Sequence, residues 1–421
     1  MAKEHPGRAF TNLAQHIDLD FLREAHSRTK KNKAPGVDGV TSVDYELNLE
    51  ANLQDLLVRF KSGRYRAPDV RRVRIPKGKG KTRPLGIPTF EDKVLQRAVA
   101  MILGAIYEQD FLPCSYGFRP GRSAHQALDA TREVLMDMKG GWVVEADIRD
   151  CFGTFDHAWM RKILGRRIRD GVLLRTIGKW LKAGVMERGQ RTLPTEGTPQ
   201  GGVISPILSN IYLHDVIDVW FERFARPRIG GQAHLIRFAD DLVILCDRKE
   251  DADRFYAGLF DRFARFGLEL HLGKTKLVPF KRPPYSGGPN ESESWNLLGF
   301  TFYWAKSRRG YWVIMRKTMA SRLSRALVAV AEWCRRNRHL PVCKQLEILS
   351  KKLSGHCGYY GLTGNSVSLA KFRRGMERVW WKWLRRRSGG AARKNWDWWA
   401  RFQERYPLPG AIAVHSVLRL T

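Results

Sequence analysis

Two adjacent carboxylates, Asp240 and Asp241, stand between two short apolar segments. Residues 234–239 and 242–246 have the leucine-rich or β-branched composition of buried strands. We therefore expect a hairpin that holds both acids at its tip. Carboxylate oxygens on such a rigid support are hard ligands that suit a divalent cation. A simple tight turn is the alternative, because aspartate is a common turn residue.

A third carboxylate, Asp147, ends another strand-like segment, residues 142–147. If the two strands are neighbours, Asp147 and Asp240 can bind the same metal ions. Two metal ions bridged by carboxylates catalyse phosphoryl transfer, because one lowers the pKa of the attacking hydroxyl and the other stabilises the leaving group. Taken alone, Asp147 is explained equally well as the end of a strand.

The chain is strongly basic. Its 421 residues include 74 Lys and Arg against 42 Asp and Glu, a formal net charge of +32, together with 14 Trp and 12 Tyr. This balance indicates a polyanionic partner, most simply nucleic acid, with a membrane surface as the rival. No apolar run approaches the roughly 20 residues of a membrane-spanning helix, and the N-terminus has no signal-peptide core. The six cysteines form no Cys-x-x-Cys pair, which argues against a zinc knuckle and suits a reducing cytoplasm.

Two further segments are able to position a ligand near the acids. A basic hairpin is predicted over residues 71–88, with Gly-Lys repeats at its tip. Its cations suit a triphosphate or a nucleic-acid backbone, although a solvated basic loop is the alternative. Residues 197–206 contain two adjacent glycines that permit close approach of a ligand, and Gln200 offers an amide donor. A turn that leads into a helix explains this loop equally well.

Helical periodicity surrounds these features. We expect helices over residues 43–60, 90–111, 124–138, 156–169, 172–183, 206–215 and 252–266. The chain is largely helical from Lys317 onward, with a boundary between lobes near 305–316. Near the C-terminus, tryptophans alternate with the basic triplet Arg385, Arg386 and Arg387. These tryptophans form either the core of a helical bundle or stacking platforms for nucleic acid, and the two roles are compatible.

The order of the motifs carries more information than any one of them. In sequence they are Lys77 with Arg83-Pro-Leu-Gly-Ile-Pro, Tyr116-Gly-Phe-Arg-Pro-Gly-Arg-Ser, Asp147 with Phe152, Thr198-Pro-Gln-Gly-Gly-Val-Ile-Ser-Pro, Phe238-Ala-Asp-Asp, Lys274-Thr-Lys and Leu298-Gly-Phe. This series resembles the reverse transcriptases encoded by bacterial group II introns, in the form without an HNH endonuclease domain. The likeness extends from about Lys30 to the C-terminus.

The resemblance implies an α+β right-hand polymerase with fingers, a palm built on an antiparallel sheet, and a helical thumb. It places an N-terminal extension and the fingers, with the start of the palm, in residues 1–140. The palm would occupy 141–305, the thumb or maturase helices 306–387, and a basic DNA-binding segment 388–421. Since the chain ends at Thr421 without an endonuclease domain, intron mobility would need a nick or primer made elsewhere.

The resemblance also assigns roles to single residues. Asp147, Asp240 and Asp241 match the family's catalytic acids, which with the Ile148 carbonyl would hold two Mg²⁺ ions. The expected dNTP contacts are Lys77, Arg83, Gln200 and Phe152, the last of which would exclude a 2′-hydroxyl. The expected nucleic-acid contacts are Lys31, Arg119, Arg122, Lys274, Lys276, Arg385, Arg386 and Arg387. Phe238 stands where the family usually has tyrosine, so we expect activity without a hydroxyl contact to the primer.

The implied function is RNA-directed DNA synthesis combined with help in intron splicing. The partners would be intron RNA, an RNA template with a DNA primer, dNTPs and target DNA, in the cytoplasm of a bacterium and without a membrane. Two alternatives stay open. One is a reverse transcriptase of this lineage that serves host defence or CRISPR spacer acquisition, and the other is an RNA-binding splicing factor with an idle polymerase site. The sequence leaves the oligomeric state undetermined.

Overall fold

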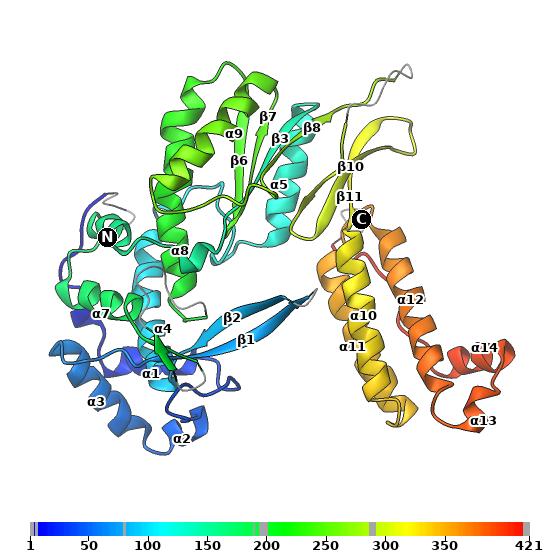
Figure 1. Cartoon of the computed structure of the whole chain (residues 1–421), viewed down its shortest axis with the longest axis horizontal. Coiled ribbons are helices and arrows are strands. Elements are labelled where there is room, and N and C mark those ends of the chain that lie inside the picture. Colours follow the sequence, from blue (N-terminus) through cyan, green and yellow to red (C-terminus); the bar gives the residue numbers. More distant parts are fainter. Residues whose placement is uncertain are drawn as a thin grey trace. The chain divides into compact units, whose positions relative to one another are not determined.

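The computed structural model describes residues 4, 7–78, 81–187, 190–192, 201–285 and 292–415. The chain divides into two compact units, and each is considered by itself. The first comprises Met1–Val134 with Gly141–Val278, and the second comprises Leu135–Gly140 with Pro279–Thr421. Helices and mainly antiparallel sheets occur together, as expected for the α+β class (Figure 1).

The central sheet of the first unit has the strand order β6-β7-β3-β8. These strands are β3 (Gly140–Asp147), β6 (Ala233–Phe238), β7 (Asp241–Cys246) and β8 (Lys276–Lys281). Residues 242–246 of β7 are all buried, which explains why the strand has a continuous apolar run in place of alternation. Helix α9 (Lys249–Ala264) lies on one side of the sheet and α5 (Ala124–Asp137) on the other (Figure 1).

The remainder of the first unit is mostly helical. Its helices are α1 (Leu19–Ser27), α2 (Ser42–Glu46), α3 (Leu49–Lys61), α4 (Phe90–Tyr107), α6 (His157–Gly165), α7 (Gly171–Leu181) and α8 (Ser205–Leu213), and α8 continues into the wider helical turns η3 (His214–Asp218) and η4 (Phe221–Ala225). The single helix expected over 43–60 is wrong. Asn48 has a non-helical backbone between α2 and α3, and asparagine commonly interrupts helices because its side chain competes for backbone hydrogen bonds.

A second sheet in this unit contains the basic hairpin. Strands β1 (Val70–Gly78) and β2 (Lys81–Ile87) pair antiparallel, with Arg71 opposite Ile87 and Ile75 opposite Arg83. This confirms the hairpin predicted over residues 71–88. On its other side β1 pairs with β4 (Val185–Glu187), which pairs with β5 (Gln190–Thr192).

The second unit begins with a three-stranded sheet of β9 (Trp295–Leu297), β10 (Phe300–Lys306) and β11 (Trp312–Thr318). Residues 305–316, where we expected a boundary, form the end of β10, a turn and most of β11. The first helix therefore starts at Ala320, slightly later than expected. The helices are α10 (Ala320–Arg336), α11 (Val342–Tyr360), α12 (Ser366–Leu384), α13 (Gly389–Ala392) and α14 (Trp396–Arg405).

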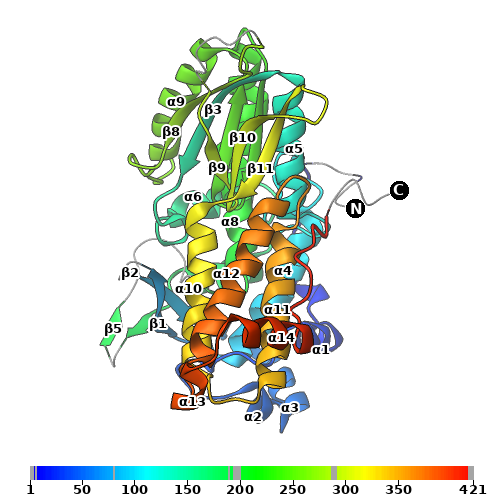
Figure 2. The same ribbon diagram turned by 90° about the vertical axis from the view of Figure 1, so that its right-hand side faces the viewer.

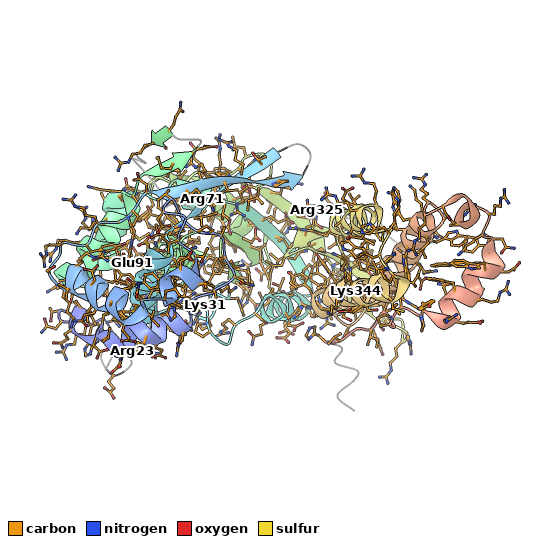
Figure 3. The ribbon with its side chains drawn as sticks, turned by 90° about the horizontal axis from the view of Figure 1, so that it is seen from below. Arg23, Lys31, Arg71, Glu91, Arg325 and Lys344 are labelled. Carbon is orange, nitrogen blue, oxygen red and sulfur yellow. The ribbon has the colours of Figure 1, made fainter. Side chains whose placement is uncertain are left out.

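Tryptophan forms much of the core of this helical region. Trp380, Trp381 and Trp399 are buried and pack against one another and against Phe402. Trp396 is 67% exposed, although its ring stacks on Trp381 with centroids 5.9 Å apart. Figure 2 shows α10, α11 and α12 side by side, and Figure 3 shows cations such as Arg325 and Lys344 on the first two of them. The bundle-core explanation thus holds for most of the cluster.

Candidate active site

The structure brings Asp147, Asp240 and Asp241 to one end of the central sheet. Asp147 is the last residue of β3, and its cross-strand partner in β7 is Asp241. Directly opposed residues of antiparallel strands have Cα atoms about 4.5–5.5 Å apart. Asp240 precedes Asp241 in the turn between β6 and β7. The hairpin and its adjacency to Asp147 are therefore confirmed.

The Asp240 carboxylate lies close to the segment that follows Asp147. Burial raises the pKa of the Cys151 thiol, and the negative charge of nearby Asp240 raises it further. Cys151 belongs to a short turn in which the Gly153 N–H donates to the Asp150 carbonyl at 2.7 Å. The negative charge of Asp240 therefore acts on Cys151, in the segment that follows β3, as well as within its own hairpin.

The turn that carries Asp240 is strained and is held from below by a buried arginine. Ala239 has a φ of 58°, in the left-handed region that a non-glycine residue rarely adopts. Arg237 is fully buried, and one of its terminal nitrogens donates to the Ala239 carbonyl at 3.1 Å. Its other hydrogens go to Asp218, Asn210 and Ser115, at 2.6–3.1 Å. All five donors of the guanidinium are thereby used, as a buried charge requires.

The segment 114–119 supports the same turn from the side. Ser115 forms a parallel bridge with Arg237, and the Tyr116 N–H donates to the Arg237 carbonyl at 2.8 Å. The Gly117 carbonyl accepts from the Asn210 side chain at 2.7 Å. A Cβ on residue 117 would overlap the backbone nitrogen of Ala239. Only glycine fits here, because the two backbones touch.

The donor set at the carboxyl end of β3 suits a hard divalent cation. The Asp147 carbonyl accepts from the His271 N–H at 2.8 Å, on the β8 side. Since carbonyls alternate in direction along a strand, the Ile148 carbonyl is directed toward β7 and the other two acids. Carboxylate and carbonyl oxygens are the ligands that Mg²⁺ prefers. The residues present therefore fit the ions that the family resemblance implies.

One carboxylate of the set already has a cationic partner. Lys274 Nζ lies 2.6 Å from Asp147 Oδ2, and the lysine is 54% exposed. Among the described residues, no three His, Cys, Asp or Glu side chains form a preassembled metal cage. The Lys274 ammonium is hydrogen-bonded to one of the two carboxylate oxygens of Asp147. Metal binding at Asp147 therefore competes with an ion pair.

The expected dNTP contacts are only partly described. Arg83 is exposed on β2. Lys77 lies within β1 and Phe152 in the turn after β3, but their side chains are outside the described part of the chain, as is the whole of Gln200. The loop is described from Gly201 onward. Gly201 has a φ of 117°, and a Cβ there would overlap the Gly86 carbonyl of β2, so the end of the loop packs on the basic hairpin.

A buried acid supports this loop from beneath. Gln96 accepts from the Ile204 N–H at 3.3 Å and donates to Asp92 at 2.9 Å. Asp92 also accepts from Trp180 Nε1 at 2.6 Å and from the Tyr65 hydroxyl. Burial raises the pKa of Asp92 to about 6, although these three donors oppose the shift. The Gly-Gly loop is thus connected to a buried carboxyl group with a raised pKa.

The predicted nucleic-acid contacts differ in their surroundings. Lys31 pairs with Glu46 and contacts His26, as its position among the N-terminal helices in Figure 3 allows. Arg119 is buried and donates to Glu108 and to two backbone carbonyls, which leaves it few donors for a ligand. Arg122 is exposed over the Tyr116 ring. Lys274 is exposed and pairs with Asp147, as described above. The other four residues are exposed, at the start of β8 and after α12; they are Lys276, Arg385, Arg386 and Arg387.

Arg385 and Arg386 lie over tryptophan rings, at 5.4 Å from Trp381 and 5.1 Å from Trp383. Arg387 donates to the carbonyls of His339 and Leu340. The triplet therefore caps the helical core of the second unit while it remains accessible to solvent.

Several supporting residues were not predicted from the sequence. They are Arg237, Asp218, Asn210, Gln96 and Asp92. The only sequence signal for Arg237 is a charge inside an apolar strand, because such a charge needs a buried partner. The partner itself, Asp218, belongs to the helical turn η3 and has no distinctive motif around it.

Comparison with known proteins agrees with this geometry. The family model described as reverse transcriptase (RNA-dependent DNA polymerase) matches residues 75–302. Protein YkfC of Escherichia coli is 42% identical over 225 residues, which are 52% of this chain and 58% of that protein. The group II intron-encoded protein LtrA of Lactococcus lactis is 37% identical over 217 residues, 51% of this chain and 36% of LtrA. The protein named nuclear intron maturase 2, mitochondrial, of Arabidopsis thaliana is 29% identical over 180 residues, which are 33% of this chain and 24% of that protein.

The chain thus spans less than two thirds of these relatives' own lengths. In the part of the chain that the structure describes, no helix is both long and apolar enough to cross a membrane. The family match covers more than half of the chain and includes all three carboxylates at the ends of β3 and β7. The chain therefore belongs to the reverse transcriptase (RNA-dependent DNA polymerase) family.

Proposed function

We propose that this protein is the RNA-directed DNA polymerase of a group II intron, which copies RNA into DNA and binds intron RNA to assist splicing. The observation that carries the proposal is the cross-strand pairing of Asp147 with Asp241, beside Asp240. The pairing unites carboxylates from distant parts of the sequence at one end of a rigid sheet. The similarity to an intron-encoded protein and to an intron maturase supports the choice of RNA.

In this proposal the reaction is the attack of a primer 3′-hydroxyl on the α-phosphate of a dNTP, with pyrophosphate as the leaving group. Asp147, Asp240, Asp241 and the Ile148 carbonyl would hold two Mg²⁺ ions, which when bound supply the charge that activates the hydroxyl and stabilises the leaving group. Arg237 fixes the carbonyl of Ala239 and so fixes the direction of Asp240.

Cations of the hairpin would bind the triphosphate. We assign this role to Lys77 and Arg83, because charged donors form strong hydrogen bonds with phosphate oxygens. Lys274 is placed beside Asp147 and would lie near the same phosphates. We assign to Phe152 the exclusion of a 2′-hydroxyl and to Gln200 a contact with the incoming nucleotide. Each assignment comes from the residue's match to the family motif. Phe238 supplies the aromatic surface next to the acids.

Nucleic-acid partners follow from the charge of the chain. Residues 1–140 and 141–305 are proposed as fingers and palm, residues 306–387 as thumb, and 388–421 as a DNA-binding segment. Arg122, Lys276 and the triplet 385–387 are exposed cations suited to phosphate contacts on the template, primer or target DNA. The net charge of +32 favours all of these contacts.

The test is cDNA synthesis on an oligonucleotide-primed RNA with Mg²⁺, comparing Asp240→Asn with the unaltered protein. We expect extension to fall at least about 10³-fold, since carboxylate-bound metal ions supply several kcal/mol of transition-state stabilisation. Asp253→Asn is the matched control, because Asp253 is exposed on α9. Splicing help retained by Asp240→Asn would show that the two activities are separable, whereas normal extension by that variant would end the proposal.

A further inference from the structure

A cationic hollow lies on the outer side of α7 in the first unit. Its volume is about 610 Å³, and it is bounded by α7, by Arg161 in the middle of α6 and by the chain near β1, β4 and β5. Six of the residues around it are basic: Arg66, Arg161, Arg175, Lys179, Lys182 and Arg191. None of the lining residues is acidic. In Figure 1, α7 lies at the edge of its unit, apart from the carboxyl end of β3.

Two of the six cations have structural partners. Arg191 forms two hydrogen bonds with the Asp69 carboxylate, at 2.8 and 3.0 Å. Lys179 donates to the carbonyls of Gly63 and Tyr65. Within the described residues, no side chain or carbonyl pairs with the other four, Arg66, Arg161, Arg175 and Lys182. Four uncompensated positive charges around one concavity attract a polyanion and repel one another without it.

The surface of the hollow is accessible as well as basic. Arg175 and Lys179 on α7 and Lys182 directly after it are spaced by four and three residues, so they share one face. Gly178 lies on the same helix and lines the hollow, and a Cβ placed on it would meet nothing within 4 Å. Because an alanine side chain would clash with nothing there, packing does not explain a glycine that costs the helix about 1 kcal/mol relative to alanine. Its lack of a side chain keeps the hollow open.

The chemistry of the lining favours a phosphate backbone. No aromatic residue borders the hollow, so base stacking has no platform there, whereas guanidinium and ammonium groups are the usual donors to phosphate. Folded RNA is recognised largely through its shape and its phosphates. The proposed polymerase acts on RNA, and this surface shares no lining residue with the proposed site.

We propose that this hollow is a second RNA-binding site, which holds the phosphate backbone of a folded RNA outside the polymerase site. The proposal rests on the proposed function only in taking RNA as the partner. It predicts a contact that does not depend on a primer end or on metal ions at Asp240. Binding to the hollow would keep the folded RNA attached while the polymerase site is empty or engaged.

The first experiment measures binding of a primer-free stem-loop RNA by fluorescence anisotropy over a range of salt concentrations. The triple variant Arg161→Gln, Arg175→Gln, Lys182→Gln is expected to weaken binding at least about tenfold. The slope of log K against log salt should also become less steep by about two to three, the change for three lost phosphate contacts. Extension of a short primed RNA by this triple variant should be unchanged. A failure of the polymerase proposal would instead appear as absent extension by the unaltered protein, so the two failures can be distinguished.

A matched control removes the same charge elsewhere. The variant Lys249→Gln, Arg254→Gln, Arg265→Gln alters exposed cations on and next to α9. If both triple variants weaken binding equally, net charge alone is responsible and the second site is refuted. Unchanged RNA affinity and salt slope in the Arg161, Arg175, Lys182 triple variant would refute it as well. Loss of phosphatidylserine-vesicle binding with RNA binding intact would assign the hollow to lipid and also overturn the proposal.

The second experiment tests location. Gly178→Cys places a reactive thiol in open space, and Gly258→Cys does the same on α9, where a Cβ also meets nothing. Both are made with Cys343→Ser, because Cys343 is the exposed native thiol and the other five are buried. After attachment of a benzophenone, ultraviolet light should cross-link the stem-loop RNA to position 178 and leave position 258 unmodified. Equal or reversed cross-linking would contradict the proposal.

Discussion

The guanidinium of Arg237 and the carboxylate of Asp218 form an ion pair in which both side chains are 0% exposed, with nitrogen–oxygen distances of 2.7 and 2.6 Å. Burial by itself would raise the pKa of Asp218, but the neighbouring guanidinium holds that pKa below its ordinary value. The pair is therefore ionised beneath the turn that carries Asp240. It links the stability of the central sheet to the direction of a proposed metal ligand.

Removal of one partner should be costly. We expect Asp218→Ala to lower the free energy of unfolding by about 3–5 kcal/mol, because the arginine is left buried and uncompensated. Urea unfolding monitored by circular dichroism measures the change. The double variant Arg237→Met with Asp218→Leu should recover much of the lost stability, since no charge remains. It should not recover DNA synthesis, because the Ala239 carbonyl still lacks its donor; full activity would contradict a positioning role.

Gly117 offers a test of the same turn through the backbone. Gly117→Ala puts a methyl group against the nitrogen of Ala239, so the turn must move. We expect extension to fall at least about tenfold, since small displacements of reacting groups are enough to lower rates by this factor or more. Gly104→Ala, on α4 with open space around its Cα, is the control. Equal activity of the two variants would show that the turn tolerates displacement.

How far the sequence alone predicts this site depends on the kind of residue. Asp147, Asp240 and Asp241 were recognisable because apolar strand-like segments flank them, and the basic hairpin because of its Gly-Lys tip. The pairing of Arg237 with Asp218 was not predictable from the sequence, since only the packing of η3 against β6 brings these two residues together. The surroundings of Arg119 were not predictable either: the motif indicates a cation for nucleic acid, and the fold directs most of its donors to Glu108 and nearby carbonyls. Local sequence indicates charge, but not whether tertiary packing neutralises it.

Asp92 should make stability depend on pH in a definite direction. Burial raises its folded-state pKa to about 6, from 3.8 for an unperturbed aspartate. The folded protein therefore binds this proton more tightly than the unfolded chain does. The stabilisation is fully present below about pH 4, declines as the pH rises toward 6, and is absent above that range.

The measurement is the difference in unfolding free energy between the unaltered protein and Asp92→Asn, at several pH values. Other titrating groups cancel in this difference. Relative to the variant, the unaltered protein should lose about 3 kcal/mol between pH 4 and pH 7, the equivalent of about two pKa units. A difference that stays constant across this range, or rises with pH, would contradict the assignment.

Lys274 should raise the concentration of Mg²⁺ that the enzyme requires. Its ammonium is 2.6 Å from Asp147, so a metal ion must displace it or share the carboxylate. We expect Lys274→Met to reach half-maximal extension at a several-fold lower Mg²⁺ concentration, because the competing charge is gone. Lys274→Arg, which keeps the charge, should retain the original requirement. An unchanged or higher requirement in Lys274→Met would show that the ion pair does not compete with metal.

The most direct test of the central claim uses Asp147, which lies on a different strand from the Asp240 hairpin. Single-nucleotide incorporation on a primed RNA is followed by rapid quench while Mg²⁺ is removed with EDTA and then restored. The unaltered protein should stop and resume, and Asp147→Asn should remain at least about 10³-fold slower at every Mg²⁺ concentration. Incorporation by Asp147→Asn at the original rate, or by either protein in EDTA, would contradict a shared metal-dependent centre at the ends of β3 and β7.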